Sequence, residues 1–447
     1  MKKKQTNLNN KKLVLVMTKE KYSGFTDLSY KPGKNDLNCE FKLMPRTGVS
    51  FEVACNAIAS ESSIGTWTEI STMKKRIYEK LRPRIYYLNE KERICKIAYP
   101  IELFEKGNIP QLMSSVAGNI FGMNALQSLR LEDIDFPDSY IKSFDGPRFG
   151  VPGIRKLLKV KSRPLLGTII KPKIGLNEKE HAQVAFNAWV GGCDIVKDDE
   201  NLTSQSFNHF EKRIKETLKM RDKAEKITGE KKVYMPNITH ETNEMLQRMK
   251  FVKQQGGEYV MLDILTLGFS ALQTVRNENK ELGLVLHAHR AMHAALTRNP
   301  EHGISMLVIA KLMRLIGLDQ LHIGTIVGKM QGSKIEVQEL EQEIEKRLVK
   351  ENARAHALEE NWLHLKPMLA VCSGGLHPGH IPKLMKYLGN NIAIQMGGGL
   401  HGNKLGTLQG AVAARQAIEA VMQGQTLFEY AKNHSELKST IHQFGIK

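Results

Sequence analysis

The feature that most constrains this chain is a series of short apolar runs, rich in branched residues, that follows Gly150 and alternates with amphipathic segments. This alternation is typical of repeated strand–helix units, and eight such units close a parallel barrel. The eight runs lie at residues 164–173, 193–200, 233–239, 259–264, 283–290, 320–325, 367–375 and 392–399. We therefore predict an α/β fold built on an eight-stranded parallel β/α (TIM) barrel.

The residues before the barrel follow a different pattern. Up to about Arg148, strand-like runs mix with two helix-like segments, at 50–60 and 109–121. A chain of 447 residues is long enough for two domains. We predict a smaller α+β N-terminal domain with a basic tail at 1–148, and a catalytic barrel domain with C-terminal helices at 149–447.

The amino-acid composition of the chain limits the classes of molecule it is expected to bind. The chain is 41% hydrophobic and 25% charged, as in folded globular proteins, and no stretch approaches the roughly 20 apolar residues of a membrane span. We expect a cytoplasmic protein without membrane contact. The five cysteines are scattered without a CxxC pair, which argues against a disulfide framework or a zinc site. The net charge of +18 favours anionic ligands, but an aromatic content of only 6% argues against nucleic acid.

Polar residues end each apolar run, where the active sites of β/α barrels lie. The second run, CDIVKDDE, places Lys197 and Asp199 on the same side of a strand, with Glu200 next to them. Two carboxylates suit Mg²⁺, which prefers oxygen ligands. The lysine leaves two alternatives. Either it forms an ordinary ion pair with the acids, or CO₂ converts it to an anionic carbamate that supplies a third oxygen ligand.

Other run ends indicate anion binding. Lys171 and Lys173 would repel each other unless an anion or acid lay between them, although one could simply point to solvent. Arginine and histidine at the ends of runs five and six favour a phosphate clamp, and glycine after runs seven and eight lets backbone N–H groups approach a phosphate. The residues concerned are His289, Arg290, His293, His322, Ser373, Gly375, Gly397 and Gly398. Two separated anion sites predict a bisphosphate.

The segment GTIVGKMQG has glycines on both sides of Lys329, as a mobile lid would. An ordinary surface turn is the alternative for this segment. If the segment is a lid, its closure would carry Lys329 to the substrate.

From about Cys39 to Ala420, these residues together resemble the large chain of ribulose-1,5-bisphosphate carboxylase/oxygenase. GGCDIVKDDE resembles the family's metal motif, which implies a carbamate on Lys197 that binds Mg²⁺ with Asp199 and Glu200. GTIIKPKIGL and HAHRAMHAA imply catalytic roles for one lysine and one histidine, with phosphate or substrate contacts around them. On this resemblance the catalytic residues are Lys171, Lys197, His289 and Lys329, and Lys173, Arg290, His293, His322, Ser373, Gly375, Gly397 and Gly398 bind substrate.

The resemblance extends to the N-terminal part. ESSIGTWTE and AGNIFG resemble segments that reach the site of a neighbouring subunit, which implies that Glu61, Thr66, Trp67 and Asn119 contact its substrate. A homodimer or an assembly of dimers is therefore expected. SGGLHPGHIPKLM and GGGLHG look closest to the archaeal-type form III or II/III enzymes, which have no small subunit and are linked to salvage of the ribose of AMP and other nucleosides. Gln320 departs from the histidine usual in plant-type chains.

The implied reaction is the Mg²⁺-dependent carboxylation of D-ribulose 1,5-bisphosphate by CO₂ and water to two 3-phosphoglycerates, with O₂ as a competing substrate. A related enolase or isomerase, which would share the barrel and metal without carboxylation, is one alternative. A non-catalytic basic binding protein is another, but it leaves the ordered polar run ends unexplained.

Overall fold

The computed structural model describes residues 24–66, 70–327 and 334–446. The predictions made for the basic tail, Trp67 and Lys329 lie outside the described residues. The chain divides into two compact units, of which the first comprises Met1–Phe144, Met292–Leu312 and Arg347–His364. The second comprises Asp145–Ala291, Met313–Lys346 and Leu365–Lys447. These units differ from the predicted domains 1–148 and 149–447, because the first unit also takes up two later segments.

The first unit is built on a five-stranded sheet with the order β10-β4-β1-β3-β2. Its strands are β1 (Asp36–Pro45), β2 (Arg84–Asn89), β3 (Ile94–Pro100), β4 (Leu126–Asp135) and β10 (Gly303–Ile304). Strand β1 pairs antiparallel with β3 and β4, whereas β10 comes from a later segment and pairs parallel with β4. This pairing explains why a segment distant in sequence belongs to the first unit.

Short helices and a small hairpin complete this unit. The helices are α2 (Phe51–Glu61), α3 (Lys75–Leu81), α4 (Ile109–Val116), α5 (Asp138–Ile141) and α12 (His293–Thr297), and the antiparallel hairpin is β12 (Leu348–Val349) with β13 (Glu360–Asn361). The buried ammonium of Lys311 lies 2.8 Å from a carboxylate oxygen of Asp133 and 3.8 Å from one of Glu360. Ion pairing to these acids compensates for the burial of the lysine and ties β4 to the hairpin.

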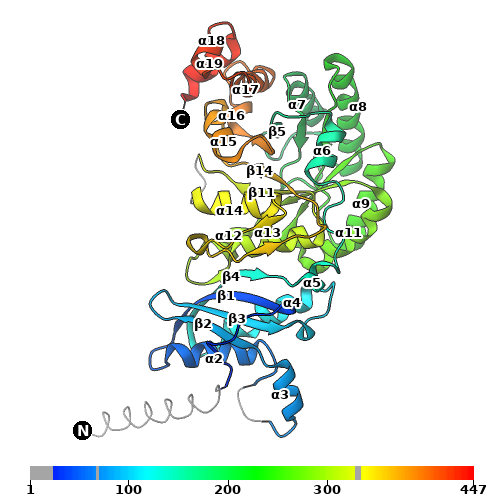
Figure 1. The fold of residues 1–447 in the computed structure, drawn as a ribbon. Coiled ribbons are helices and arrows are strands. Elements are labelled where there is room, and N and C mark those ends of the chain that lie inside the picture. The colour runs from blue at the N-terminus through cyan, green and yellow to red at the C-terminus, as the bar shows by residue number, and fades with distance from the viewer. Residues whose placement is uncertain (1–23, 67–69, 328–333, 447) are drawn as a thin grey trace, which may run out of the picture. The chain divides into compact units, whose positions relative to one another are not determined.

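The second unit is an eight-stranded parallel barrel, as the sequence predicts (Figure 1). Its strands are β5 (Leu165–Ile169), β6 (Ile195–Lys197), β7 (Val233–Met235), β8 (Tyr259–Asp263), β9 (Val285–His289), β11 (Gln320–Gly324), β14 (Leu369–Cys372) and β15 (Ile392–Met396). Each predicted run contains one of these strands. The residues after β7 pair with β8 through a bridge between Asn237 and Met261, which closes the barrel.

Helices follow the strands of the barrel, as predicted. They are α7 (Glu178–Val190), α8 (Phe210–Thr228), α9 (Thr242–Gln254), α11 (Phe269–Leu282), α13 (Met306–Ile316), α14 (Lys334–Glu345), α15 (Ile381–Leu388) and α17 (Thr407–Met422). Further helices are α6 (Gly150–Leu158), α10 (Ile264–Leu267), α16 (Gly398–His401), α18 (Leu427–Ala431) and α19 (Ser435–Phe444). Across the described ranges, no helix combines the length and the apolar character that crossing a membrane requires.

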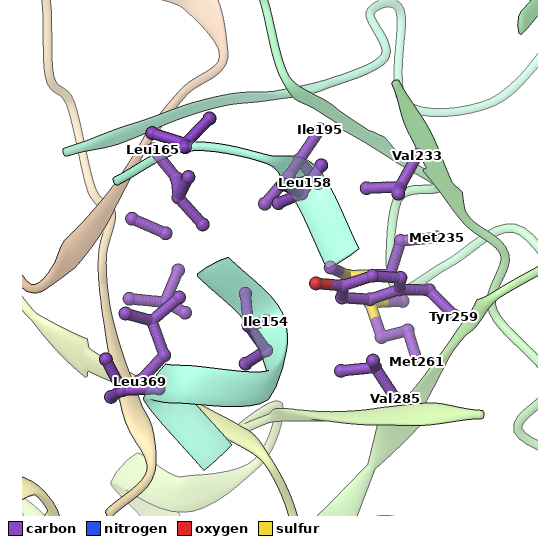
Figure 2. Close-up of a cluster of buried hydrophobic side chains, with 14 residues drawn as sticks. Ile154, Leu158, Leu165, Ile195, Val233, Met235, Tyr259, Met261, Val285 and Leu369 are labelled. Atoms are coloured by element: carbon purple, nitrogen blue, oxygen red, sulfur yellow. The ribbon is translucent and has the colours of Figure 1, made fainter. Parts of the chain in front are cut away.

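Apolar side chains fill the N-terminal end of the barrel. Ile154 and Leu158 of α6 pack against the first residues of several strands, among them Leu165, Val233 and Val285 (Figure 2). All of these side chains are buried. Since this end is packed solid, the polar residues at the other end of the strands form the open end of the barrel.

Asp319, the residue before β11, fixes α6 at this closed end. Its carboxylate is fully buried and accepts hydrogen bonds from the backbone N–H groups of Phe149 at 2.6 Å, Gly150 at 2.9 Å and Leu286 at 3.0 Å. Burial raises the pKa of Asp319, and these N–H groups oppose the rise. One side chain therefore joins the start of α6 to the start of β9.

We predict that Asp319→Ala lowers the free energy of unfolding by about 3 kcal/mol, because it leaves three N–H donors, two of them buried, without an acceptor. Urea denaturation followed by tryptophan fluorescence measures this change. Glu281→Ala, which removes an exposed carboxylate at the end of α11, is the control and should change the free energy of unfolding by less than about 0.5 kcal/mol. Equal stability of the two variants would contradict this account of the closed end.

Candidate active site

The end of β6 carries the centre of the site. The side chain of Lys197 is fully buried, and its Nζ donates a hydrogen bond to the backbone oxygen of Asp198 at 2.7 Å. Burial lowers the pKa of Lys197, whereas the negative charges of Glu200 and then Asp199 act in the opposite direction. Lys197 has no carboxylate within ion-pair distance in the described part of the chain, so the ordinary ion pair left open above does not form at this residue.

The two aspartates that follow Lys197, just beyond the end of β6, have different partners. The carboxylate of Asp198 points to the surrounding helices, where it lies 3.1 Å from Nη2 of Arg213 on α8 and 3.1 Å from Nε2 of His181 on α7. It also accepts a hydrogen bond from the hydroxyl of Tyr234 at 2.6 Å. Burial alone would raise the pKa of Asp198, but the guanidinium of Arg213 holds it down at about 2. Asp198 therefore binds side chains outside the barrel, and Asp199 has different partners.

Asp199 instead pairs with Lys171. The Nζ of Lys171 lies 2.7 Å from Oδ2 of Asp199, and Oδ1 accepts from the side-chain amide of Asn201 at 2.9 Å. Lys171 also lies beside Gly397, where an added Cβ would come within 3.1 Å of its Cε. Residues at the ends of β5, β6 and β15 thus meet at one place.

The sequence prediction that Lys171 and Lys173 end a strand together needs correction. Strand β5 ends at Ile169, so both lysines lie in the following loop, and strand alternation does not orient them. Lys173 is exposed, while Lys171 reaches Asp199. In the run at 164–173, the apolar part forms strand β5, whereas the polar carboxyl end lies outside the sheet.

A second group of side chains surrounds His289 at the end of β9. Its Nδ1 lies 2.7 Å from Oδ1 of Asp263, and its Nε2 lies 3.6 Å from Oε2 of Glu200. The carboxylate of Asp263 only accepts hydrogen bonds, so it holds the proton of His289 on Nδ1. Sequence reasoning missed Asp263, although it ends β8 and the rule applied to the other strands would have found it.

His322 and Arg290 extend this group toward β11 and β14. The ring of His322 meets that of His289 edge-on with centroids 4.9 Å apart, and its Nδ1 lies 2.7 Å from the hydroxyl of Ser373. The guanidinium of Arg290 lies against Gly324, where an added Cβ would fall 2.6 Å from Nη2. Burial lowers the pKa of Arg290 to about 10, at which it is still a cation at neutral pH.

Glycines line the strand ends on the other side of β14. Gly375 follows β14 with a φ of +71°, a backbone conformation that residues with a side chain rarely adopt. Gly397 follows β15, and Gly398 begins α16. An added Cβ on Gly398 would meet nothing within 4 Å, so the backbone here faces open space. The absence of a side chain at these positions would let an anion approach the backbone.

The remaining predicted residues lie in the first unit. Asn119 donates a hydrogen bond from its side-chain amide to Oε1 of Glu61 at 3.4 Å, and Thr66 is partly exposed. His293 begins α12, and its Nδ1 lies 2.9 Å from the hydroxyl of Thr297. The structure thus brings Glu61 and Asn119 together within this unit.

The residues at the end of β6 could hold a hard cation. In residues 24–66, 70–327 and 334–446, no group of three His, Cys, Asp or Glu side chains is arranged to hold a metal ion. Asp199 and Glu200 offer carboxylate oxygens, and Lys197 is buried close to them. A carbamate on Lys197 would add a third oxygen donor to these two carboxylates.

Comparisons with known proteins identify the family of this chain. The family model described as "Ribulose bisphosphate carboxylase large chain, catalytic domain" matches residues 150–444, and the corresponding N-terminal domain model matches residues 24–140. The "Ribulose bisphosphate carboxylase" of Methanosarcina mazei is 53% identical over 418 residues, which cover 93% of this chain and 98% of the relative. That of Pyrococcus horikoshii is 47% identical and covers 97% of this chain and 98% of its own length.

Solved structures give the same result. A dimeric archaeal Rubisco from Hyperthermus butylicus is 43% identical with a TM-score of 0.90, and the match covers 95% of this chain and 99% of that chain. An octameric Rubisco from Pyrococcus horikoshii OT3 is 46% identical with a TM-score of 0.88, covering 94% and 96%. The resemblance and the enzyme class predicted from sequence are therefore confirmed: the chain belongs to the ribulose bisphosphate carboxylase large-chain family, in its archaeal type.

Proposed function

We propose that this chain carries out the Mg²⁺-dependent carboxylation of D-ribulose 1,5-bisphosphate by CO₂ and water to two 3-phosphoglycerates, with O₂ competing at the same step. The observation that carries this proposal is the contact of Lys171 with Asp199 beside the buried Lys197, at the open end of the barrel. The cationic guanidinium of Arg290, just after β9, and the buried ring of His322 on β11 lie nearby. The alternative of a non-catalytic basic binding protein does not explain this arrangement.

The metal would be held by Asp199, Glu200 and a carbamate on Lys197. When bound there, Mg²⁺ would polarise the carbonyl group of the substrate and stabilise the negative charge that develops on its oxygens. Asp199 now accepts from Lys171, so occupation of the site would release this ammonium to act on the substrate. Once released, Lys171 would be placed to deliver the final proton to a product.

His289 would handle protons beside this centre. The carboxylate of Asp263 keeps a proton on Nδ1, so Nε2 presents a lone pair on the side of Glu200. A neutral imidazole in this tautomer can accept a proton from substrate carbon or oxygen. In this proposal Lys329 belongs to a lid that steadies the carboxylated intermediate.

The two phosphates would bind at separate strand ends. Arg290 follows β9 and His322 lies on β11, whereas Gly397 and Gly398 follow β15, and β14 lies between these strands in the sheet. The guanidinium of Arg290 suits one phosphate, and backbone N–H groups suit the other. Ser373, Gly375, Lys173 and His293 complete the proposed substrate contacts.

We further propose that the enzyme is a homodimer or an assembly of dimers without a small subunit, in which Glu61, Thr66, Trp67 and Asn119 complete a neighbouring copy's site. Relatives titled dimeric and octameric support this assembly. The contact of Asn119 with Glu61 shows that two of these residues already lie together. A role in salvage of the ribose of AMP and other nucleosides follows from the resemblance to form III and II/III enzymes.

We predict that purified protein given ribulose 1,5-bisphosphate, Mg²⁺ and labelled bicarbonate forms labelled, acid-stable 3-phosphoglycerate. Lys197→Ala should abolish this product, because it removes a ligand of the metal, and Lys329→Ala should abolish it by removing the lid lysine. Chelation of the metal should stop the reaction reversibly. A product that retains the carbon skeleton of the bisphosphate without label would instead support the enolase or isomerase alternative.

We also predict that Gly324→Ala lowers kcat/KM at least ~10-fold, mainly through KM, because the added methyl group displaces the guanidinium of Arg290 from its place against β11. Gly268→Ala is the matched control. Its φ of +79° is as unfavourable for alanine as the +90° of Gly324, but its Cβ meets nothing within 4 Å. Equal losses of kcat/KM in the two variants would show that the effect comes from backbone strain and not from displacement of Arg290.

A further inference from the structure

One polar pair inside the barrel has no role in the reaction proposed above. His287 on β9 and Gln320 on β11 are direct partners in the parallel ladder, and both side chains are fully buried. Nδ1 of His287 lies 2.9 Å from Oε1 of Gln320. His287 precedes His289 by two residues, so it lies one pleat deeper on the same side of the strand.

This contact selects the tautomer of His287. A side-chain carbonyl oxygen can only accept a hydrogen bond, so Nδ1 must carry the proton and Nε2 must keep a lone pair. The Nε2 atom is buried and, within the described residues, has no hydrogen-bond partner. The two nitrogens lie on opposite edges of the ring, so Nε2 faces away from Gln320 and β11.

The surroundings of His287 connect it with Lys197. The ring of His322 meets that of His287 edge-on, with centroids 4.7 Å apart. Burial and then the positive charge of Lys197 lower the pKa of His287 well below its usual range. His287 is therefore a neutral ring inside the barrel, and Lys197 is the charged residue that acts on it most strongly.

We propose that Gln320 is a positioning residue whose side-chain oxygen fixes His287 in the Nδ1–H tautomer, so that the lone pair of Nε2 stays directed away from β11 as a hydrogen-bond acceptor. The effect on turnover rests on the function proposed above. Gln320 begins β11 and lies one pleat below His322, away from the phosphate clamp. Its loss should therefore slow turnover without weakening substrate binding.

Gln320→Met tests this role, because methionine has a similar length and no strong acceptor. The matched control is Gln395→Met. Gln395 lies on β15 of the same barrel, is 1% exposed, and has no hydrogen-bond partner for either side-chain polar atom in the described part of the chain. The two substitutions make the same chemical change, but only one removes a contact with a histidine.

The first readout is the histidine ¹⁵N NMR spectrum, which distinguishes the two tautomers, recorded without CO₂, Mg²⁺ or substrate. The signal of His287 is assigned by its loss in His287→Leu. We expect the Nδ1–H tautomer in the wild-type protein and in Gln395→Met, and a mixture or the other tautomer in Gln320→Met. An Nε2–H tautomer in the wild-type protein overturns the proposal, and this result does not require Gln320→Met to fold.

The second readout is turnover. We expect Gln320→Met to lower kcat about 10-fold while KM for ribulose 1,5-bisphosphate changes less than about twofold. Adding Gln320→Met to His287→Leu should cost no further activity, because Gln320 acts through His287. Additive losses, or an equal loss in Gln395→Met, overturn the proposal. If the wild-type protein fixes no label, the proposed function fails, and the NMR result still decides the tautomer.

Discussion

The outward anchoring of Asp198 is the interaction on which the rest of the site depends. Its carboxylate is buried with Arg213, His181 and Tyr234 between the barrel and its helices. Asp198 directly follows β6, and its backbone N–H still donates to the oxygen of Met235 on β7 at 3.1 Å, so its outward side chain leaves Lys197 on the inner side of the barrel. A buried charge with this many partners is costly to move. The direction of Lys197 is thus determined by groups that never touch a substrate.

The two ends of the barrel have complementary physical roles. At one end, α6 and the first residues of the strands form a packed apolar floor, and Asp319 ties α6 to β9. At the other end, carboxylates, imidazoles and ammonium groups contact one another at the strand ends. The rigid floor fixes the spacing of the strands, and that spacing fixes the distances between the polar groups they carry.

The sequence predicted the barrel well because its signals are local. Each of the eight runs contains a strand, and the polar residue that ends a run can be identified directly, as for Lys197 and His289. Strand alternation also predicts that Asp199, and not Asp198, shares a side with Lys197. Local patterns were insufficient where the chain leaves the sheet, and so the prediction that Lys171 and Lys173 lie on one side at the end of a strand was wrong.

Pairings between strands could not be predicted, because they depend on register. Nothing local to Gln320 indicates that its oxygen faces His287, or that Asp263 holds His289. The pairing of β10 with β4, which brings a late segment into the first unit, is equally non-local. The sequence thus predicted candidate reactive groups, and the structure supplied the contacts that these side chains make.

The central claim is that Lys197 takes up CO₂ as a carbamate and holds Mg²⁺ with Asp199 and Glu200. The most direct measurement is a ¹³C NMR spectrum of the protein with ¹³C-bicarbonate and Mg²⁺, recorded for the wild-type chain and for Lys197→Ala. Our account predicts a protein-bound carbamate signal in the wild type that is absent from the variant. A wild-type spectrum without this signal, or a signal that persists in Lys197→Ala, would contradict it.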